Sequence, residues 1–402
     1  MALANETGIR IADGVYRIGG DDRTAPIFEG AFPVPEGVSY NSYVIMDERT
    51  ALLDTCDASI AARFWNALRD TLGDRTLDYF VIDHMEPDHG AGIRQILDMY
   101  PEVTVVGNAR TFEMLFNFYG IEPVNRLVVA EGDVLDLGRH KLRFISAVMV
   151  HWPEVMFAYD ETDRILFSAD AFGTFRTLSG ALYADETDFD SEYLDEARRY
   201  YSNIVGKYGS KVQAVFKKLD GVPVDMICPL HGPIWREDLG YILGKYDLWS
   251  RYEPEEKGVV IAYSTMYGNT AAIADRLALL LKDRGVERVN VYDVTRMHPS
   301  YVVSDAFRFT NIVLAAPTYN NGLHPTMVTT IHAMADMAVQ GRRYSLIANG
   351  SWAPRSGEIM EGMMSELRGM EKVGDTFTVM SAMHTDRLPE LEALADAIVA
   401  SL

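Results

Sequence analysis

The chain has 402 residues, of which 48% are hydrophobic and 24% are charged, and its formal net charge at pH 7 is −21. This composition is that of a folded globular protein long enough for two domains, and it argues against intrinsic disorder. The negative charge argues against binding to nucleic acid, because such binding depends on clustered Lys and Arg side chains.

The cysteines Cys56 and Cys228 are the only two in the chain and form neither a disulfide framework nor a CxxC motif. The N-terminal segment lacks the basic start and apolar run of a secretory signal, and no segment reaches the roughly 20 apolar residues that span a membrane. We therefore expect a soluble protein of the reducing cytoplasm with no membrane partner.

Short strands with few helices are predicted for the first part of the chain. Apolar and alternating runs predict strands at 14–20, 38–47, 50–56, 77–83, 103–108, 140–150, 155–160 and 164–170. Helices are predicted at 59–72 and 109–120. Turn residues separate the last three of these strands, which predicts that they pair as consecutive antiparallel neighbours.

The apolar periodicity stops at 249–258, where charged residues, Pro254 and Gly258 accumulate as at an interdomain linker. We place a boundary near residue 254, which predicts domains at 1–253 and 254–402. Beyond it, helices alternate with strands at 258–264, 286–294, 311–319, 344–350 and 375–380. The first helix has an apolar face made by Ile273, Leu277, Leu280 and Leu281. Apolar strands joined by crossover helices predict an open, doubly wound α/β sheet with parallel strands.

Carboxylate and imidazole side chains crowd the end of the strand 77–83, in the segment DHMEPDHG at 83–90. Pro87 and Gly90 favour a turn over a helix, so that several side chains converge on one point. Metal ions account for this crowding. Further candidates stand at the ends of predicted strands, namely His151, Asp170 and His231. His140 lies in a polar turn and is predicted to be at the surface.

The candidate ligands are four imidazoles and three carboxylates: His84, Glu86, Asp88, His89, His151, Asp170 and His231. They are too many for one tetrahedral zinc ion and suit two five- or six-coordinate ions that share a bridging carboxylate. Three negative charges also offset much of the charge of two cations, which lowers the cost of burying them. The sequence therefore predicts a two-metal site.

These residues resemble the metallo-β-lactamase superfamily, whose hydrolases usually carry His-x-His-x-Asp-His. Glu86 stands where that pattern has its second histidine. Together with the later ligands, this departure resembles the flavodiiron protein (A-type flavoprotein) family, in which an αβ/βα metallo-β-lactamase-like sandwich carries non-haem iron. A harder oxygen ligand also suits iron, whereas zinc has no redox chemistry. The resemblance implies one iron held by His84, Glu86 and His151, another held by Asp88, His89 and His231, and a bridge between them from Asp170.

The second domain begins with a strand that runs into the segment STMYGNT at 264–270 and then into a helix. Its hydroxyls, its amide and the free backbone N–H groups of a helix start suit a phosphate. The segment lacks the Lys of a triphosphate-binding loop and the GxGxxG of a dinucleotide fold. It resembles flavodoxin, which implies FMN with its ring at the carboxyl ends of neighbouring strands.

The loops expected to contact FMN follow three predicted strands. The candidate contacts are Ser264, Thr265, Met266, Tyr267, Gly268, Asn269, Thr270, Pro317, Thr318, Tyr319, Asn320, Asn321, Gly322, Asn349, Gly350, Ser351 and Trp352. Tyr319 and Trp352 are the aromatic side chains expected to stack on the ring.

The resemblance to flavodiiron proteins covers nearly the whole chain and implies an oxidoreductase that reduces O2 to water, NO to N2O, or both. Electrons would pass through FMN to two irons from an external donor: rubredoxin, a flavin reductase or reduced coenzyme F420. Asp170 and His89 are the candidate catalytic residues at the irons, and Tyr200 and Tyr201 are the candidate sources of a proton or hydrogen bond. The family's head-to-tail pairing implies a homodimer or homotetramer.

Two other interpretations stay open. One is a zinc-dependent hydrolase with an accessory flavodoxin domain, and the other is an electron-transfer module whose metal site is catalytically silent. The sequence does not predict a preference between O2 and NO, because that choice depends on the shape of the site around the metal ligands.

Overall fold

The computed structural model describes residues 7–402. The chain divides into a first unit, made of the residues up to Tyr200 and Ser210–Tyr246, and a second unit, made of Tyr201–Gly209 and Asp247–Leu402. The predicted limits 1–253 and 254–402 differ from this division because the helical segment η3 (Tyr201–Val205) packs against α10 (Pro299–Arg308) of the second unit. Within residues 7–402, none of the helices is both long and apolar enough to cross a membrane.

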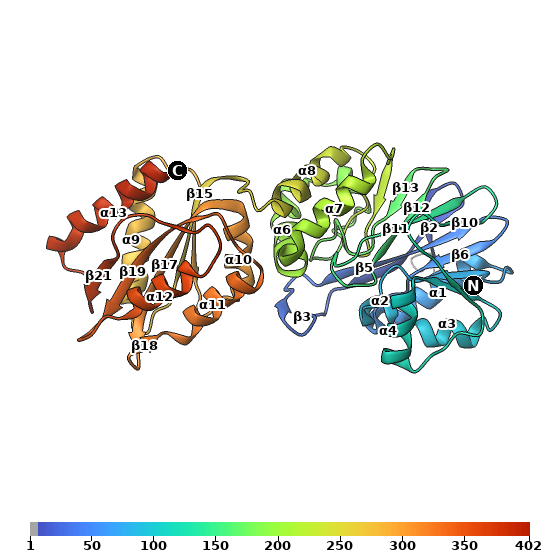
Figure 1. The fold of residues 1–402 in the computed structure, drawn as a ribbon, viewed down its shortest axis with the longest axis horizontal. Coiled ribbons are helices and arrows are strands. Elements are labelled where there is room, and N and C mark those ends of the chain that lie inside the picture. The colour runs from blue at the N-terminus through green and yellow to red at the C-terminus, as the bar shows by residue number, and fades with distance from the viewer. Residues whose placement is uncertain (1–6) are drawn as a thin grey trace. The chain divides into compact units, whose positions relative to one another are not determined.

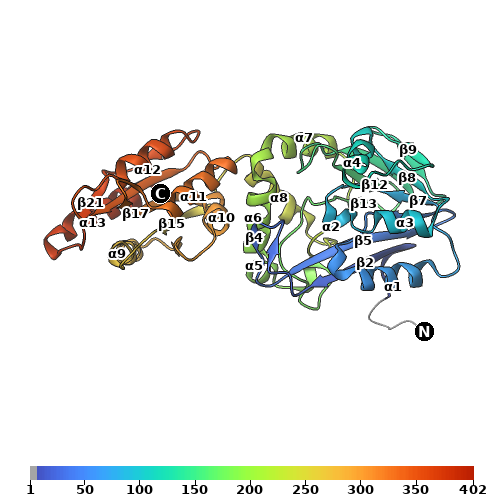
Figure 2. The same ribbon diagram turned by 90° about the horizontal axis from the view of Figure 1, so that it is seen from below.

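The larger sheet of the first unit has seven strands in the order β1 (Ile9–Ala12), β2 (Val15–Asp22), β5 (Val38–Met46), β6 (Thr50–Leu53), β7 (Tyr79–Val81), β8 (Thr104–Gly107) and β9 (Arg126–Val128). The strands from β1 to β6 pair antiparallel, and those from β6 to β9 pair in parallel. Parallel neighbours need a crossover connection, and the crossovers here contain α1 (Ala61–Leu72), α3 (Ile93–Met99) and α4 (Ala109–Tyr119). Figure 2 shows α1 lying along β2.

The smaller sheet has five strands in the order β10 (Val134–Asp136), β11 (Lys141–Ser146), β12 (Met156–Asp160), β13 (Ile165–Phe167) and β14 (Met226–Cys228). The predicted antiparallel succession is confirmed for β11, β12 and β13, and β14 joins β13 in parallel. The two sheets face each other, since the ring centres of Tyr43 in β5 and Phe167 in β13 lie 5.1 Å apart. The first unit is therefore the expected α/β sandwich.

Shorter elements complete the first unit and its borders. They are β3 (Ile27–Phe28), β4 (Phe32–Pro33), η1 (Ala58–Ile60), α2 (Pro87–Gly90), η2 (Ala184–Glu186), α5 (Phe189–Glu192), α6 (Leu194–Tyr200), η4 (Gly206–Tyr208), α7 (Gly209–Leu219) and α8 (Leu239–Ser250). The candidate ligands lie in the segments that follow β7, β11, β13 and β14, with Asp88 and His89 in α2 and the others in loops.

The sheet of the second unit has the order β16 (Val289–Asp293), β15 (Glu256–Tyr263), β17 (Phe309–Tyr319), β19 (Arg343–Gly350) and β20 (Glu371–Lys372), with β21 (Phe377–Met380) also paired to β19. All of these pairings are parallel, and the short β18 (Gly322–Leu323) folds back on β17. The helices are α9 (Asn269–Asp283), α10, α11 (Pro325–Asp336), α12 (Ser356–Ser365), η5 (Thr385–Arg387) and α13 (Leu388–Ser401) (Figure 1). The predicted doubly wound sheet is confirmed, with the strand order of flavodoxin-like folds.

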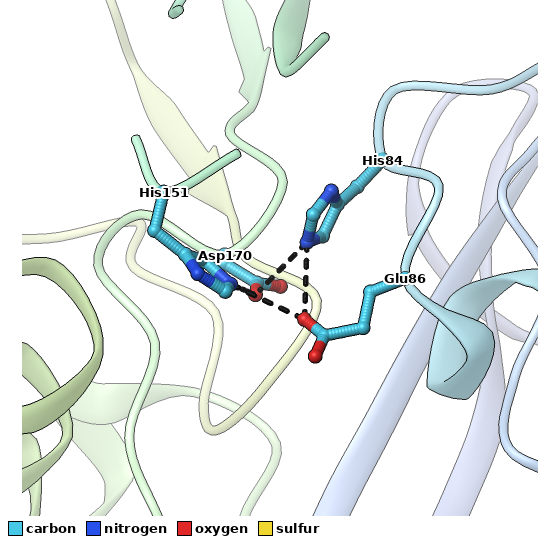
Figure 3. Close-up of side chains that lie close together, drawn as sticks. All are labelled: His84, Glu86, His151 and Asp170. Atoms are coloured by element: carbon cyan, nitrogen blue, oxygen red, sulfur yellow. Dashed lines mark hydrogen bonds and ion pairs between the residues drawn. The ribbon is translucent and has the colours of Figure 1, made fainter. Parts of the chain in front are cut away.

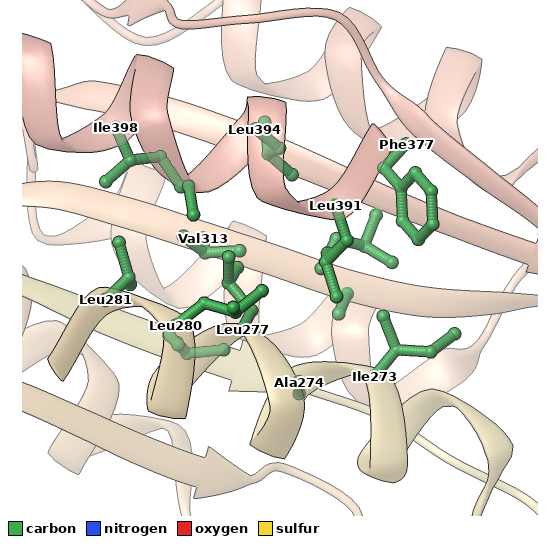
Figure 4. Close-up of a cluster of buried hydrophobic side chains, with 14 of the residues drawn as sticks. Ile273, Ala274, Leu277, Leu280, Leu281, Val313, Phe377, Leu391, Leu394 and Ile398 are labelled. Carbon is green, nitrogen blue, oxygen red and sulfur yellow. The ribbon is translucent and has the colours of Figure 1, made fainter. Parts of the chain in front are cut away.

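The core on one face of this sheet lies between the strands and the helices α9 and α13 (Figure 4). The predicted apolar face of α9 is confirmed, because Ile273, Leu277, Leu280 and Leu281 are all at most 4% exposed. Each such side chain contributes roughly 1.5–3 kcal/mol when it leaves water. This packing holds α9 against the sheet and so positions its N-terminus.

Candidate functional site

The first predicted ligands lie in the loop that leads from β7 into α2. The prediction of a turn without a helix is wrong, because Pro87 begins a single helical turn. Proline suits the first position of a helix, where its missing N–H group is not needed. Asp54 holds the loop from behind, since its Oδ1 accepts hydrogen bonds from the backbone N–H groups of Asp83 at 3.0 Å and His84 at 3.2 Å.

Four predicted ligands form a first group, His84, Glu86, His151 and Asp170, whose ligand atoms all lie within 4.8 Å of one another (Figure 3). The Oε2 of Glu86 lies 3.2 Å from the Nε2 of His84 and 3.2 Å from the Nε2 of His151. All four residues are buried, although they come from three loops that are far apart in the sequence. His151 is five residues beyond the end of β11, so the loop, and not the strand end predicted from the sequence, carries it to the group.

The remaining three predicted ligands form a second group of Asp88, His89 and His231. The Nε2 atoms of the two histidines lie 3.1 Å apart. The Oδ2 of Asp88 lies 3.4 Å from the Nε2 of His89 and 3.3 Å from that of His231. The donor atoms of this group therefore also face a common point.

Asp170 links the two groups. Its Oδ2 lies 3.0 Å from the Nε2 of His151 and 3.5 Å from that of His84, in the first group. Its Oδ1 lies 3.2 Å from the Nε2 of His89 and 3.7 Å from that of His231, in the second group. One carboxylate thus presents one oxygen to each group, which is the arrangement of a bridging ligand.

The chemistry of these donors fits bound cations. Both carboxylate oxygens of Asp88 are buried without a hydrogen-bond partner among the described residues. The facing Nε2 atoms of His89 and His231 are close enough to bind one cation, and nitrogen and oxygen donors in this number suit two ions of a redox-active metal such as iron. A cation satisfies the lone pairs that the protein leaves unpaired here.

Without cations, three of the candidate ligands, His84, His89 and His151, hold an additional proton. Burial lowers the pKa of His151, but the hydrogen bond to Asp170 and neighbouring carboxylates outweigh burial and raise this pKa to about 9. Burial also lowers the pKa of His89, and the charge of Asp88 leads the effects that raise it to about 9. The pKa of His84 rises well above its usual value against burial, because carboxylates surround it. The imidazoles of His84, His89 and His151 are therefore protonated at neutral pH without metal, and the carboxylates of Glu86 and Asp170 stay ionised beside them.

The Nδ1 atoms of three of these imidazoles have different surroundings. The Nδ1 of His84 lies 2.8 Å from the Oε1 of Glu154, and the Nδ1 of His231 lies 2.9 Å from the backbone oxygen of Ser39. The Nδ1 of His89 is buried and has no hydrogen-bond partner among the described residues. Burial raises the pKa of Glu154, but the hydrogen bond with His84 outweighs it and holds this pKa below its usual value. Sequence reasoning missed Glu154 and Ser39, because no spacing rule connects them to their histidines.

The prediction that His140 lies at the surface is wrong, because this residue is 1% exposed. Its Nδ1 lies 2.8 Å from the Oδ2 of Asp160, and its Nε2 lies 2.9 Å from the backbone oxygen of Asp13, against which its turn folds. Asp163 lies with His140 and Asp160 in a third group of potential ligands. Arg139 pairs with both oxygens of Asp163, at 2.9 and 2.5 Å, so hydrogen bonds and an ion pair already satisfy this group.

The two neighbouring tyrosines face different surroundings. Tyr201, one of the two predicted proton donors, has its ring 5.2 Å from that of Trp249 and 6.2 Å from that of Phe307. The ring of Tyr200 lies 5.7 Å from His231, and its buried hydroxyl has no hydrogen-bond partner among the described residues. Burial, together with the charge of nearby carboxylates, raises the pKa of Tyr200 well above its usual value. Tyr200 therefore faces the candidate metal centre with a hydroxyl that keeps its proton.

A cavity of about 700 Å³ in the first unit borders the second group of ligands. Its lining includes Glu86 and Asp88 and, further out, Tyr40 and Ile27. The ring of Tyr40 lies 5.4 Å from that of His231, so the cavity reaches close to the imidazoles. A small molecule in this cavity comes close to the candidate metal positions.

The second unit has a cavity of about 420 Å³ where loops follow β15, β17 and β19. The predicted contacts that line it are Thr265, Met266, Tyr267, Asn269, Thr270, Pro317, Thr318, Tyr319, Asn320, Asn321, Asn349, Gly350, Ser351 and Trp352. Ser264, Gly268 and Gly322 do not line it, and the sequence analysis missed Ala353 and Ser381, the latter because it follows a further strand, β21. The cavity lies where the strand order reverses, between β15 and β17.

The start of α9 fits the phosphate of FMN. Gly268 precedes the helix with a φ of +91°, a conformation that favours glycine, and its N–H group donates to the Oγ1 of Thr265 at 3.0 Å. The Oγ of Ser264 is buried without a hydrogen-bond partner among the described residues. Free N–H groups at the start of this 15-residue helix add to these donors and favour an anion.

Both units match known families. Residues 38–232 match the family described as ODP family beta lactamase, and residues 260–393 match the flavodoxin domain family. The anaerobic nitric oxide reductase flavorubredoxin of Aliivibrio fischeri is 30% identical over 349 residues, which cover 86% of this chain and 70% of that protein. The protein of the same name from Shigella flexneri is 29% identical over 365 residues, which cover 90% of this chain and 75% of that one.

Solved structures match nearly the whole chain. The flavodiiron protein from Giardia intestinalis superposes with a TM-score of 0.92 and 25% identity, covering 98% of this chain and 97% of its own. The rubredoxin oxygen:oxidoreductase from the anaerobe Desulfovibrio gigas superposes with a TM-score of 0.92 and 24% identity, covering 98% of both chains.

Proposed function

The chain belongs to the flavodiiron protein family, and from this we propose that it is an oxidoreductase that reduces O2 to water, NO to N2O, or both. Its cofactors are FMN and a non-haem diiron centre. An external donor supplies the electrons, which reach the diiron centre through FMN.

The observation that carries this proposal is the position of Asp170 between two groups of ligands. The four imidazoles meet its carboxylate oxygens at 3.0 to 3.7 Å, two imidazoles on each oxygen. A hydrolase with one zinc needs no such bridge, whereas two ions that act on one diatomic molecule must be held close together. The flavin domain adds a source of electrons, for which hydrolysis has no use.

The side chains of the chain have distinct roles in this proposal. His84, Glu86 and His151 hold one ion, and Asp88, His89 and His231 hold the other. The two irons, when bound, supply redox-active coordination positions for O2 or NO. Tyr200, whose ring lies beside His231, holds a proton at its Oη, and this hydroxyl has no hydrogen-bond partner among the described residues that would compete with a bound molecule.

The flavin contacts have roles as well. Ser264, Thr265 and the first N–H groups of α9 bind the phosphate of FMN. FMN, when bound, takes up electrons in pairs and gives them up singly. Tyr319 and Trp352, at the wall of the cavity, cover the ring.

We propose a head-to-tail homodimer, alone or as half of a homotetramer, in which the flavin of one chain approaches the metal centre of the other. Large aromatic surfaces lie open at the flavin cavity, because Tyr267 is 90% exposed and Trp352 is 87% exposed. Ile27, at the cavity beside the metal ligands, is 51% exposed. Apolar surface at both sites supports their burial against a second copy.

The electron donor and the location of the protein are further parts of the proposal. Rubredoxin is the first donor to test, because the curated relatives are named flavorubredoxins. A flavin reductase and reduced coenzyme F420 are the other candidates. Cys56 and Cys228 are unpaired and buried, which supports the reducing cytoplasm as the location.

Metal and flavin analysis of the purified protein, followed by anaerobic NO and aerobic O2 consumption with a chemically reduced donor, tests the function. The expected result is two irons and one FMN per chain with turnover of at least one gas, and the two assays side by side establish the preference. Asp170→Asn weakens the bridge and should abolish turnover while leaving the flavin spectrum unchanged. Stoichiometric zinc in place of iron, or unchanged gas consumption in this variant, contradicts the proposal.

A further inference from the structure

The two candidate metal positions have the same direct ligands in number and type. Each has two imidazoles and one carboxylate of its own, and both face the shared Asp170. The first position has Glu86 as its own carboxylate, and the second has Asp88. By direct ligands alone, two irons at these positions would be nearly equivalent.

The difference lies behind the imidazoles. Glu154 is fully buried, and its Oε1 accepts hydrogen bonds from the Nδ1–H of His84 at 2.8 Å and from the backbone N–H of Met85 at 2.9 Å. Glu154 stands in the loop of His151, three positions further on, so it joins the two loops that carry the imidazoles of the first position.

Among the described residues, no carboxylate accepts a hydrogen bond from the Nδ1 of either imidazole of the second position, and the buried Asp54 interacts with His84 as well as with His89. The Nδ1 of His231 faces the neutral backbone oxygen of Ser39 at 2.9 Å, and the Nδ1 of His89 has no hydrogen-bond partner among the described residues. The first position thus has a carboxylate hydrogen-bonded to the Nδ1 of one of its imidazoles, and the second position has none.

A carboxylate behind a ligating imidazole has two effects. It keeps the ring proton on Nδ1, so that the Nε2 lone pair of His84 points into the cluster, and it makes the ring a stronger electron donor to a metal. A buried negative charge near an iron also favours the ferric over the ferrous ion, because the ferric ion has the larger positive charge. A neutral carbonyl, such as that of Ser39 behind His231, orients the imidazole but changes the charge around a bound ion much less.

We propose that Glu154 is a positioning residue that makes the two iron positions inequivalent. The ion held by His84, Glu86 and His151 binds more tightly and stays ferric at lower potential than the ion held by Asp88, His89 and His231. When the two ferric ions accept one electron each, the second position is therefore reduced first. This inference rests on the proposed function, since it requires two irons in the site.

The test compares Glu154→Gln with a matched control, Asp160→Asn. The glutamine keeps an oxygen that accepts from His84 and Met85 but removes the charge. The control removes the charge from another buried pair with the same 2.8 Å distance, between Asp160 and the Nδ1 of His140, outside both metal groups. Anaerobic Fe(II) titration measures the two affinities, and stepwise reduction followed by the EPR signal of the half-reduced iron pair measures the separation of the two reduction steps.

In Glu154→Gln the tighter Fe(II) affinity should fall about 10- to 100-fold, and the two reduction steps should move closer together. Asp160→Asn should leave both measurements unchanged. Wild-type affinities and separation in Glu154→Gln, or an equal shift in the control, overturn the inference. If Glu154→Gln does not fold, the same measurements are made on Glu154→Asp, whose side chain is one methylene shorter, so that its carboxylate lies further from His84. Wild-type values in Glu154→Asp again overturn the inference.

The failure of this inference differs from the failure of the proposed function. Fewer than two irons in the wild-type protein contradicts the proposed function. Two irons in the wild type, with two reduction steps that do not respond to Glu154→Gln, contradicts only the role of Glu154.

Discussion

Loading the metal-free protein with two divalent ions at pH 7 should release about three protons per chain, because imidazoles must be neutral to bind a metal. The pKa values of His89 and His151 are each raised to about 9, and that of His84 is raised well above its usual value. A group with a pKa of 9 is about 99% protonated at pH 7. Two of these protons come from the first group of ligands and one from the second.

The pH dependence follows from the same shifts. Below pH 9, the apparent affinity should rise about 100-fold per pH unit at the first group, where two protons leave, and about tenfold per unit at the second. The metal-free fold should respond in the opposite sense. Each raised pKa adds to the free energy of unfolding of the metal-free protein, and this contribution is fully present below about pH 6.5. For each of His89 and His151 it amounts to roughly 3 kcal/mol, and it is lost as the pH rises through 9.

A pH indicator in weakly buffered solution measures the released protons during titration with Zn(II), and parallel titrations between pH 6.5 and 8.5 measure the affinities. His140→Gln is the control, because His140 lies outside both metal groups, and it should release the same number of protons. Release of less than one proton per chain, or affinities that do not change with pH, would refute the reasoning.

Three further predictions concern the second unit and the pairing of chains. Gly268→Ala should weaken FMN binding about tenfold, because a φ of +91° costs a residue with a Cβ roughly 1–2 kcal/mol, and quenching of flavin fluorescence measures this affinity. Leu277→Ala should destabilise the second unit by about 2–5 kcal/mol, measured by denaturant unfolding, while iron content stays unchanged. Mixing Asp170→Asn with Thr270→Asp, which places a negative charge at the phosphate site, should restore turnover that neither variant has alone. Lack of recovery after verified subunit exchange contradicts transfer of electrons between chains.

Much of the candidate metal centre follows from the sequence, because the order of strands brings their ends to one edge of the sandwich. The segment at 83–90 and Asp170 and His231 each follow a predicted strand, and the structure gathers all of them. The face of α9 was predictable for a similar reason, since helical periodicity shows which side is buried. The sequence did not distinguish Tyr200 from Tyr201, because only tertiary contacts show that the ring of Tyr200 lies beside His231 while that of Tyr201 packs on Trp249.

The polar residues of β5 show what a single sequence leaves unexplained. Ser39, Asn41 and Tyr43 alternate along the strand, so they share one face, and all three are buried. The Oγ of Ser39 accepts a hydrogen bond from the backbone N–H of Gly232 at 2.7 Å, while the side chains of Asn41 and Tyr43 donate to the backbone oxygen of Pro229, at 2.8 and 2.7 Å. Buried polar side chains in a strand indicate that hydrogen-bond partners lie nearby. Only the fold shows that these partners belong to the loop that carries the metal ligand His231.

Two histidine–carboxylate pairs in the first unit show why the chemistry of a pair does not determine its role. In both pairs a buried imidazole places its Nδ1 2.8 Å from a carboxylate, Asp160 for His140 and Glu154 for His84. The Nε2 of His140 then faces the backbone oxygen of Asp13, an acceptor that a ring N–H group satisfies. The Nε2 of His84 faces carboxylate oxygens that a second imidazole also approaches, so that more electron pairs converge there than ring protons can satisfy. A cation satisfies these excess electron pairs. The same kind of histidine–carboxylate pair therefore anchors a turn at His140 and orients a metal ligand at His84.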